Sequence, residues 1–230
     1  MHHDAANPTR IHIAGVDIAL QDAGNILTQL RDAYAELQNR FDAFRGDSRN
    51  PHLCRAGCSH CCRRGAVFAV TLVEAIEWSM AITGLPRDLR STVVATARTL
   101  MIQQHAVFAA CPGRPDTPGD RDEAMFSRRI AQLNAAGPAC PLLQADLCSV
   151  YDRRPLLCRA YGYPVDAYAV EAPAALVFRS LCLLYEGMSL ADYVRARDIK
   201  AQMSELSIRL GGGRDWGRFT SVEAILAVLG

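Results

Sequence analysis

Nine cysteines in a chain of 230 residues constrain the fold more than any other feature of the sequence. One cysteine, Cys111, stands alone in a loop rich in proline and glycine, and we expect it to be a bystander. The other eight form a dense set and a looser set, namely Cys54, Cys58, Cys61, Cys62 and Cys140, Cys148, Cys158, Cys182. Short spacings let one chain place several sulfurs around an ion, and thiolates select zinc, copper(I) or iron–sulfur clusters over magnesium or calcium. We therefore expect these eight thiols to bind metal.

A packing role is the alternative for the dense set. On one continuous helix its four positions would share a face, as a stripe of core residues does. Free cysteine is also a small, often buried hydrophobe. Gly57 and Gly65 disfavour such a helix, however, and polar neighbours such as His60 and Arg63 are unusual in a core helix. The composition of the segment therefore favours metal binding.

The neighbouring pair Cys61 and Cys62 restricts how the sulfurs can be shared. Consecutive side chains diverge by about 100° on a helix and point to opposite faces on a strand. One of the two sulfurs is therefore expected to belong to a second ion, a cluster edge or the supporting core. Eight sulfurs allow two four-cysteine sites, or one site with additional thiols. His60 is a possible zinc ligand by residue type, but thiolates outnumber it and we expect it to be a bystander.

Composition excludes several classes of protein and of partner. Half of the residues are hydrophobic and the net charge is +1, which excludes a disordered chain and gives no general attraction to nucleic acid or anionic membranes. No apolar run is long enough for a membrane span, and the first residues lack the basic and apolar regions of a secretory signal. We expect a cytoplasmic protein, where reduced thiols favour metal over disulfides.

Apolar residues recur every three or four positions through much of the chain, and this period predicts a mainly α-helical fold. Capping-box patterns begin at Thr71 and Thr220. The predicted helices cover residues 22–45, 72–83, 87–110, 120–135, 189–210 and a last segment after Thr220.

Other segments predict strands and turns. We expect a short strand or an ordered lead-in within residues 11–20, a hairpin within 139–151, and a short helix capped by Asp152 with Pro155 in its first turn. The sequence thus predicts a single helical domain with a small β-hairpin or irregular cysteine-rich metal-binding core. Residues 1–50 form its lead-in, residues 51–185 hold the cysteine cluster, and the helices of 186–230 pack on the same domain.

The cysteine motifs resemble a known family. Residues 54–63, then 140–143 and 148–159, resemble the YkgJ-type cysteine cluster family, also described as zinc- or iron-chelating domains. The resemblance covers about residues 50–185 and includes the pattern C-P-x-L followed by C-x-[IV]-Y-x-x-R-P-x-x-C-R. One departure is the spacing from Cys54 to Cys58, which is one residue longer than in the family. The resemblance implies an iron–sulfur cluster, which we favour, or a zinc or iron ion.

Arginines crowd the same motifs, although Lys200 is the only lysine and arginine is the default cation of this chain. Arg154 and Arg159 match the family pattern, and we expect them to offset the charge of a thiolate-bound metal and to donate hydrogen bonds to sulfur. The alternative is an anion pocket for a substrate carboxylate or phosphate.

Three functions fit such a centre. The first is a redox or metal-dependent enzyme acting on an unidentified small molecule. The second is a structural zinc module that binds a protein partner, and the third is metal chelation or delivery. No sequence signature of a hydrolytic triad favours another chemistry.

Overall fold

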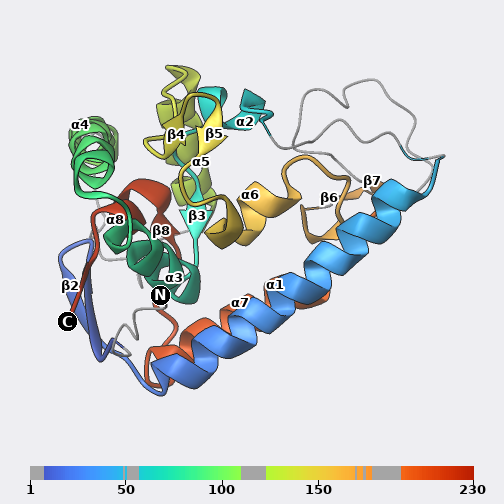
Figure 1. The fold of residues 1–230 in the computed structure, drawn as a ribbon, viewed down its shortest axis with the longest axis horizontal. Coiled ribbons are helices and arrows are strands. Elements are labelled where there is room, and N and C mark those ends of the chain that lie inside the picture. Colours follow the sequence, from blue (N-terminus) through green and yellow to red (C-terminus); the bar gives the residue numbers. More distant parts are fainter. Residues whose placement is uncertain are drawn as a thin grey trace.

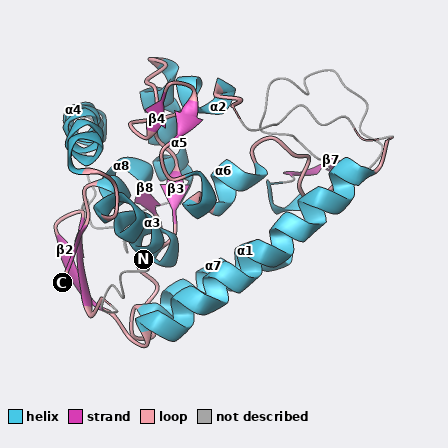
Figure 2. Cartoon of the chain, viewed as in Figure 1, coloured by secondary structure: helices cyan, strands magenta, loops and turns pink. Residues whose placement is uncertain are grey.

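The computed structural model describes residues 8–48, 50, 57–109, 123–168, 170–172, 175–177 and 193–230. Within these residues the fold is mainly helical, as predicted, with short strands between the helices (Figures 1 and 2). Cys54, Cys111 and Cys182 lie outside the described residues, and so does the predicted loop at 111–119.

The helices are α1 (Ala23–Gly46), α2 (His60–Arg64), α3 (Leu72–Thr83), α4 (Arg87–Ala109), α5 (Glu123–Ala135), α6 (Leu156–Ala160), α7 (Arg197–Leu210) and α8 (Ser221–Ile225). The strands are β1 (Arg10–Ile13), β2 (Val16–Ala19), β3 (Ala69–Val70), β4 (Leu143–Gln144), β5 (Leu147–Cys148), β6 (Val170–Ala172), β7 (Ala175–Val177), β8 (Phe219–Thr220) and β9 (Val228–Leu229). The long predicted helices are thus confirmed to within a few residues, except α7.

Both predicted capping boxes are present. At the start of α3 the Thr71 hydroxyl accepts from the Glu74 backbone N–H, and the Thr71 N–H donates to the Glu74 carboxylate at 2.9 Å. At the start of α8 Thr220 and Glu223 make the same reciprocal pair. These bonds satisfy N–H groups that have no partner inside the helix, which fixes both helix starts.

Two local predictions were wrong and one was incomplete. The segment predicted as a short strand or an ordered lead-in is strand, but it forms the hairpin β1–β2, because Ala14 and Gly15 adopt positive φ and turn the chain back. Helix α7 starts later than predicted, because Val194 pairs with Val165 as a β-bridge. The residue that caps α6 is Pro155, whereas Asp152 lies in a separate 3-10 turn.

Helix α3 is the centre of the fold. Nine of its twelve residues are buried, because α1, α7 and α8 all pack against it. A helix that is apolar on most of its circumference belongs inside a protein. Trp78, on this helix, is 1% exposed and packs edge-to-face on Phe68. Side chains on α3 can therefore support the elements packed around this helix.

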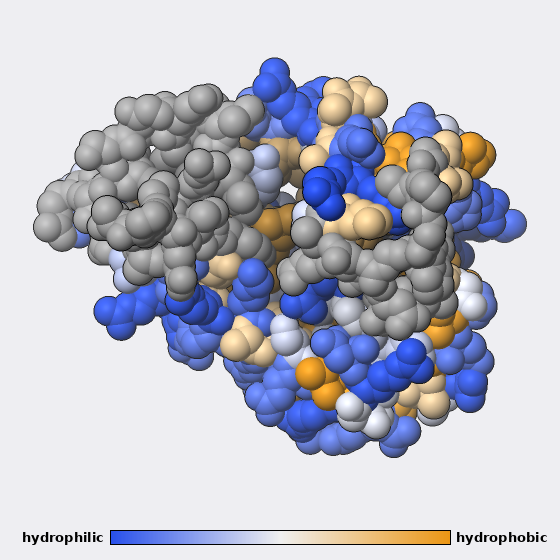
Figure 3. All heavy atoms as spheres, turned by 180° about the vertical axis from the view of Figure 1, so that it is seen from behind, coloured by the Kyte–Doolittle hydropathy of each residue, from blue (hydrophilic) through white to orange (hydrophobic). Residues whose placement is uncertain are grey.

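The outer layers close around this centre. Strand β1 pairs with both β2 and β9, in the order β2-β1-β9, and α7 packs along α1 (Figure 1). None of the described helices combines the length and the apolar character needed to cross a membrane. Hydrophilic residues predominate on the face in Figure 3, and hydrophobic ones are scattered over it.

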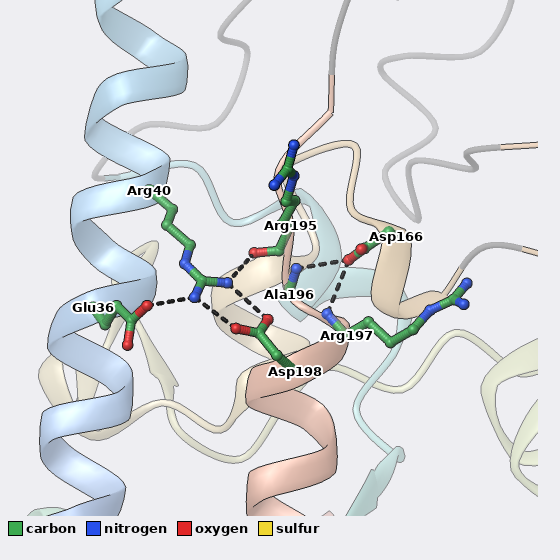
Figure 4. Close-up of polar contacts among 7 residues, drawn as sticks. All are labelled: Glu36, Arg40, Asp166, Arg195, Ala196, Arg197 and Asp198. Carbon is green, nitrogen blue, oxygen red and sulfur yellow. Dashed lines mark hydrogen bonds and ion pairs between the residues drawn. The ribbon is translucent and has the colours of Figure 1, made fainter.

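One arginine fastens α1 to the start of α7 (Figure 4). Arg40 donates to both carboxylate oxygens of Asp198, at 2.7 and 2.6 Å, and to the backbone carbonyl of Arg195 at 2.8 Å. It also pairs with Glu36 one turn earlier on α1. Asp166 receives the backbone N–H groups of Ala196 and Arg197, which satisfies the first donors of α7.

Asp198→Asn is expected to lower the free energy of unfolding by about 0.2–1 kcal/mol at neutral pH, since the Asp198 side chain is 61% exposed and solvent screens its pair with Arg40. The hydrogen bond from Arg40 lowers the pKa of Asp198 in the folded protein. The pair therefore stabilises the fold above the unfolded-state pKa of about 3.9 and loses that effect as the pH falls through the lower folded-state value. Urea unfolding at neutral and acidic pH should show the difference between wild type and variant shrinking in acid. Asp32→Asn, at an exposed carboxylate of α1, is the control, and an equal pH-dependent effect there would contradict the assignment.

Candidate metal centre

Six of the eight predicted metal ligands line one cavity of about 40 Å³. They come from the segment before α2, from α2 itself, from the β4–β5 hairpin region and from α6; they are Cys58, Cys61, Cys62, Cys140, Cys148 and Cys158. All six are free thiols and partly buried. The structure thus brings the dense set and most of the looser set together, whereas Cys54 and Cys182 lie outside the described residues.

Hydrogen bonds fasten α2 to the hairpin. The backbone N–H of Cys140 donates to the carbonyl of Cys62 at 2.7 Å. Asp146, in the tight hairpin turn, accepts from the Ser59 hydroxyl at 2.6 Å and from Arg63 Nε at 3.0 Å. The Ser59 hydroxyl and Arg63 lower the pKa of Asp146, which keeps this carboxylate ionised and available as an acceptor. The thiols of α2 therefore face those of the hairpin across the cavity.

A buried carboxylate on α3 positions α6, which forms the third wall of the thiol cavity. Glu74 accepts from the backbone N–H of Leu156, the first residue of α6, at 2.8 Å. The same carboxylate accepts from the Tyr34 hydroxyl on α1 at 2.8 Å and from its own capping partner Thr71. Since Leu156 lies two residues before Cys158, these bonds fix the point from which α6 presents its thiol.

The sulfurs of Cys61 and Cys62 lie 3.9 Å apart. They do not diverge as the geometry of a regular helix suggests. Two sulfurs that bind one tetrahedral ion at about 2.3 Å are separated by about 3.8 Å. The observed spacing is therefore compatible with one ion shared by both thiols.

Burial and the hydrogen bond between Cys61 and Cys62 determine the pKa values of the cavity thiols when no cation is bound. The hydrogen bond between the adjacent thiols lowers the pKa of Cys61 and raises that of Cys62. Burial raises the pKa of Cys140 to about 12 and also raises the pKa values of Cys148 and Cys158. Most of these thiols therefore keep their protons at neutral pH, and a bound cation would have to displace them.

Two buried polar atoms at the cavity lack a partner among the described residues. They are Nε1 of Trp78 and Nε2 of His60, and both residues line the cavity. A buried indole N–H is a donor that normally finds an acceptor, and leaving it unsatisfied is unfavourable. Sequence reasoning missed Trp78, because a tryptophan on an apolar helix is indistinguishable from a core residue.

Arg154 also lines the cavity, but Arg159 does not. Arg154 stacks on the Tyr151 ring, and its charge opposes the effect of burial on the pKa values of Cys148 and Cys158. Arg159 instead lies over the Tyr34 ring and donates from Nε to the carbonyl of Arg154 at 2.6 Å. Of the two arginines singled out from the sequence, Arg154 can contact a bound metal centre, whereas Arg159 supports the backbone of Arg154.

The donor set around the cavity fits a thiolate-bound metal by residue type. Within the part of the chain that the structure describes, no three His, Cys, Asp or Glu side chains are already grouped to hold a metal ion. A third ligand to the Cys61–Cys62 pair would have to come from a change of side-chain rotamer or from the undescribed cysteines. No protein-family model, curated protein or solved structure matches the chain.

Proposed function

We propose that this protein binds an iron–sulfur cluster, or a single zinc or iron ion, through cysteines of the cavity between α2, the β4–β5 hairpin and α6. The observation that carries the proposal is the composition of this cavity. Six thiols line it, together with the unpartnered N–H of Trp78. Thiolates bind such a centre, and an N–H donor beside them can stabilise it by a hydrogen bond to sulfur.

The donors around the cavity favour a cluster over a single ion. The six thiols exceed the four that either one tetrahedral ion or one four-cysteine cluster binds, so the distinction comes from the other donors. Inorganic sulfide in a cluster accepts hydrogen bonds, which would satisfy Trp78, and the charge of Arg154 would offset the negative charge of the thiolates. A bound cluster would supply electron transfer or activate a substrate at an open iron.

A single zinc ion is the second candidate, and two observations favour it. The Cys61 and Cys62 sulfurs have the spacing of two ligands of one ion, at 3.9 Å. The cavity volume of about 40 Å³ exceeds the roughly 10–15 Å³ that one water molecule needs, so an ion fits without expanding the site. A closed four-cysteine zinc site would make the centre structural and leave partner binding as the function.

The test is purification of the full chain without oxygen, followed by measurement of iron, zinc, acid-labile sulfide and visible absorption. Brown protein with matching amounts of iron and sulfide supports the cluster. Colourless protein with tightly held zinc supports the structural module, and zinc that exchanges readily with a chelator supports delivery. Protein that retains no metal, also after anaerobic reconstitution with iron and sulfide or with zinc, would overturn the proposal.

A further inference from the structure

A second cleft, of about 500 Å³, adjoins the thiol cavity and is lined by arginines. Helix α1 contributes two of them, and the segment from the 3-10 turn to α6 contributes three; they are Arg31, Arg45, Arg153, Arg154 and Arg159. The acidic residues that line it in the described part of the chain are Glu77 and Asp152. Positive charge therefore exceeds negative charge in this arginine cleft.

The bonds made by these arginines divide them into three groups, and one of these is Arg45, which pairs with Asp42 on α1. Arg31 and Arg153 both pair with Glu77, a carboxylate that is only 3% exposed and therefore holds both guanidinium groups in place. Arg154 and Arg159 have no carboxylate partner among the described residues. Arg154 donates from Nε to the carbonyl of Tyr151 at 3.0 Å, and Arg159 donates to backbone carbonyls.

This arrangement leaves donors directed at no acceptor. The terminal nitrogens of Arg154 make no polar contact with the described residues, while stacking on Tyr151 fixes the plane of its guanidinium group. A planar guanidinium held in this way is suited to bind a carboxylate or phosphate through two parallel hydrogen bonds. Some other arginines of the described chain do have a carboxylate partner, as Arg40 has Asp198 and Arg10 has Asp17.

The arginine cleft and the thiol cavity share a wall. Tyr151 and Arg154 line both spaces, so one guanidinium group and one phenol ring lie at their boundary. An anion bonded to Arg154 would therefore lie next to the thiols. Electrostatic attraction would also bring anions to this side of the molecule.

We propose that the arginine cleft binds a small molecule through a carboxylate or phosphate group and holds it beside the thiol cavity, as the substrate of the metal centre. The role as substrate rests on the proposed metal centre, whereas the binding of the anion does not. A carboxylate and a phosphate share the chemistry that Arg154 recognises, so two probes are needed to tell them apart.

The test is isothermal titration calorimetry on the full chain at low ionic strength, with pyrophosphate and with citrate as probes. Saturable binding of one of them is expected, and added salt should weaken it. Arg154→Gln is expected to weaken it at least about tenfold, because charge-assisted hydrogen bonds are lost. Arg98→Gln, at an exposed arginine of α4 with the same change in charge, is the control and should alter affinity less than about twofold.

A second variant separates binding from folding and from metal. Arg31→Gln lies on α1, away from the thiols, and leaves Glu77 paired with Arg153. It should weaken anion binding and leave the metal content, measured on the same samples, unchanged. No saturable binding of either probe, or equal losses in Arg154→Gln and Arg98→Gln, would overturn the proposal. Anion binding by a protein that retains no metal would support the anion site and sink only the metal centre and the substrate role.

Discussion

Cys158→Ser is expected to lose most of the metal that the wild-type protein retains. The thiol lies on α6 and faces the cavity that Cys61 and Cys62 line from α2, so it can complete a centre that those two residues begin. Losing a contact that merely supports a ligand lowers metal affinity by about 10–100-fold, and losing a ligand costs more. Metal content after anaerobic purification measures the effect, and so does the midpoint of thermal unfolding, since ligands of the folded state raise it.

Controls separate the loss of a ligand from a packing defect. Thermal unfolding of metal-free wild type and metal-free Cys158→Ser gives the packing cost alone, and the excess seen with metal belongs to the centre. Cys58→Ser should behave like Cys158→Ser, because it lines the same cavity from another segment. Cys111→Ser, outside the sequence motifs, should keep its metal. A full complement of metal in both Cys58→Ser and Cys158→Ser would show that the two sets of cysteines do not share a centre.

Glu74→Ala is expected to destabilise the protein by at least about 3 kcal/mol, since each buried donor left without an acceptor costs about 1–3 kcal/mol. The carboxylate receives the Tyr34 hydroxyl and the backbone N–H groups of Thr71 and Leu156, all within 2.9 Å. None of these donors can reach water easily, because the site is buried at the centre of the fold. Urea unfolding measures the loss, and metal content should fall as well, because α6 loses its attachment to α3.

The size of this effect can be checked against milder changes. Tyr34→Phe removes one of the donors together with its hydrogen bond and is expected to cost about 1 kcal/mol. Glu36→Ala, at an exposed carboxylate of α1, should change stability by less than about 0.5 kcal/mol. If Glu74→Ala is no more destabilising than Glu36→Ala, the bonds to α1 and α6 do not hold these helices in place.

Local sequence patterns predicted what depends on local forces. The periodic apolar residues of α1 and α3 define their buried faces, and Thr71 and Thr220 mark helix starts through bonds to residues three positions ahead. These interactions connect neighbours in the chain, so a single sequence contains the information needed to find them.

Long-range contacts account for what the sequence could not reveal. Helix α7 begins at Arg197 rather than near 189. One reason is that Val165 and Asp166, which are far away in sequence, bind the backbone around the start of this helix. Trp78 joins the thiol cavity only because α3 passes behind it. The metal-binding role of the cysteines was predicted from their residue type, their spacing and a family resemblance, whereas the hydrogen bond from Cys140 to Cys62 that joins the two sets has no sequence pattern.

The pairing of β1 with β9 has a consequence for the order of events during synthesis. Ile11 lies opposite Leu229, and the N–H of Thr9 bonds to the carbonyl of Gly230. The hairpin β1–β2 emerges from the ribosome long before residues 228–230 and cannot acquire its third strand until these have been translated. Helix α1 likewise lacks its packing partner until α7 has been translated. The nascent chain must therefore keep apolar surface exposed until residues 228–230 have been translated, a state in which aggregation competes with folding and chaperones are useful.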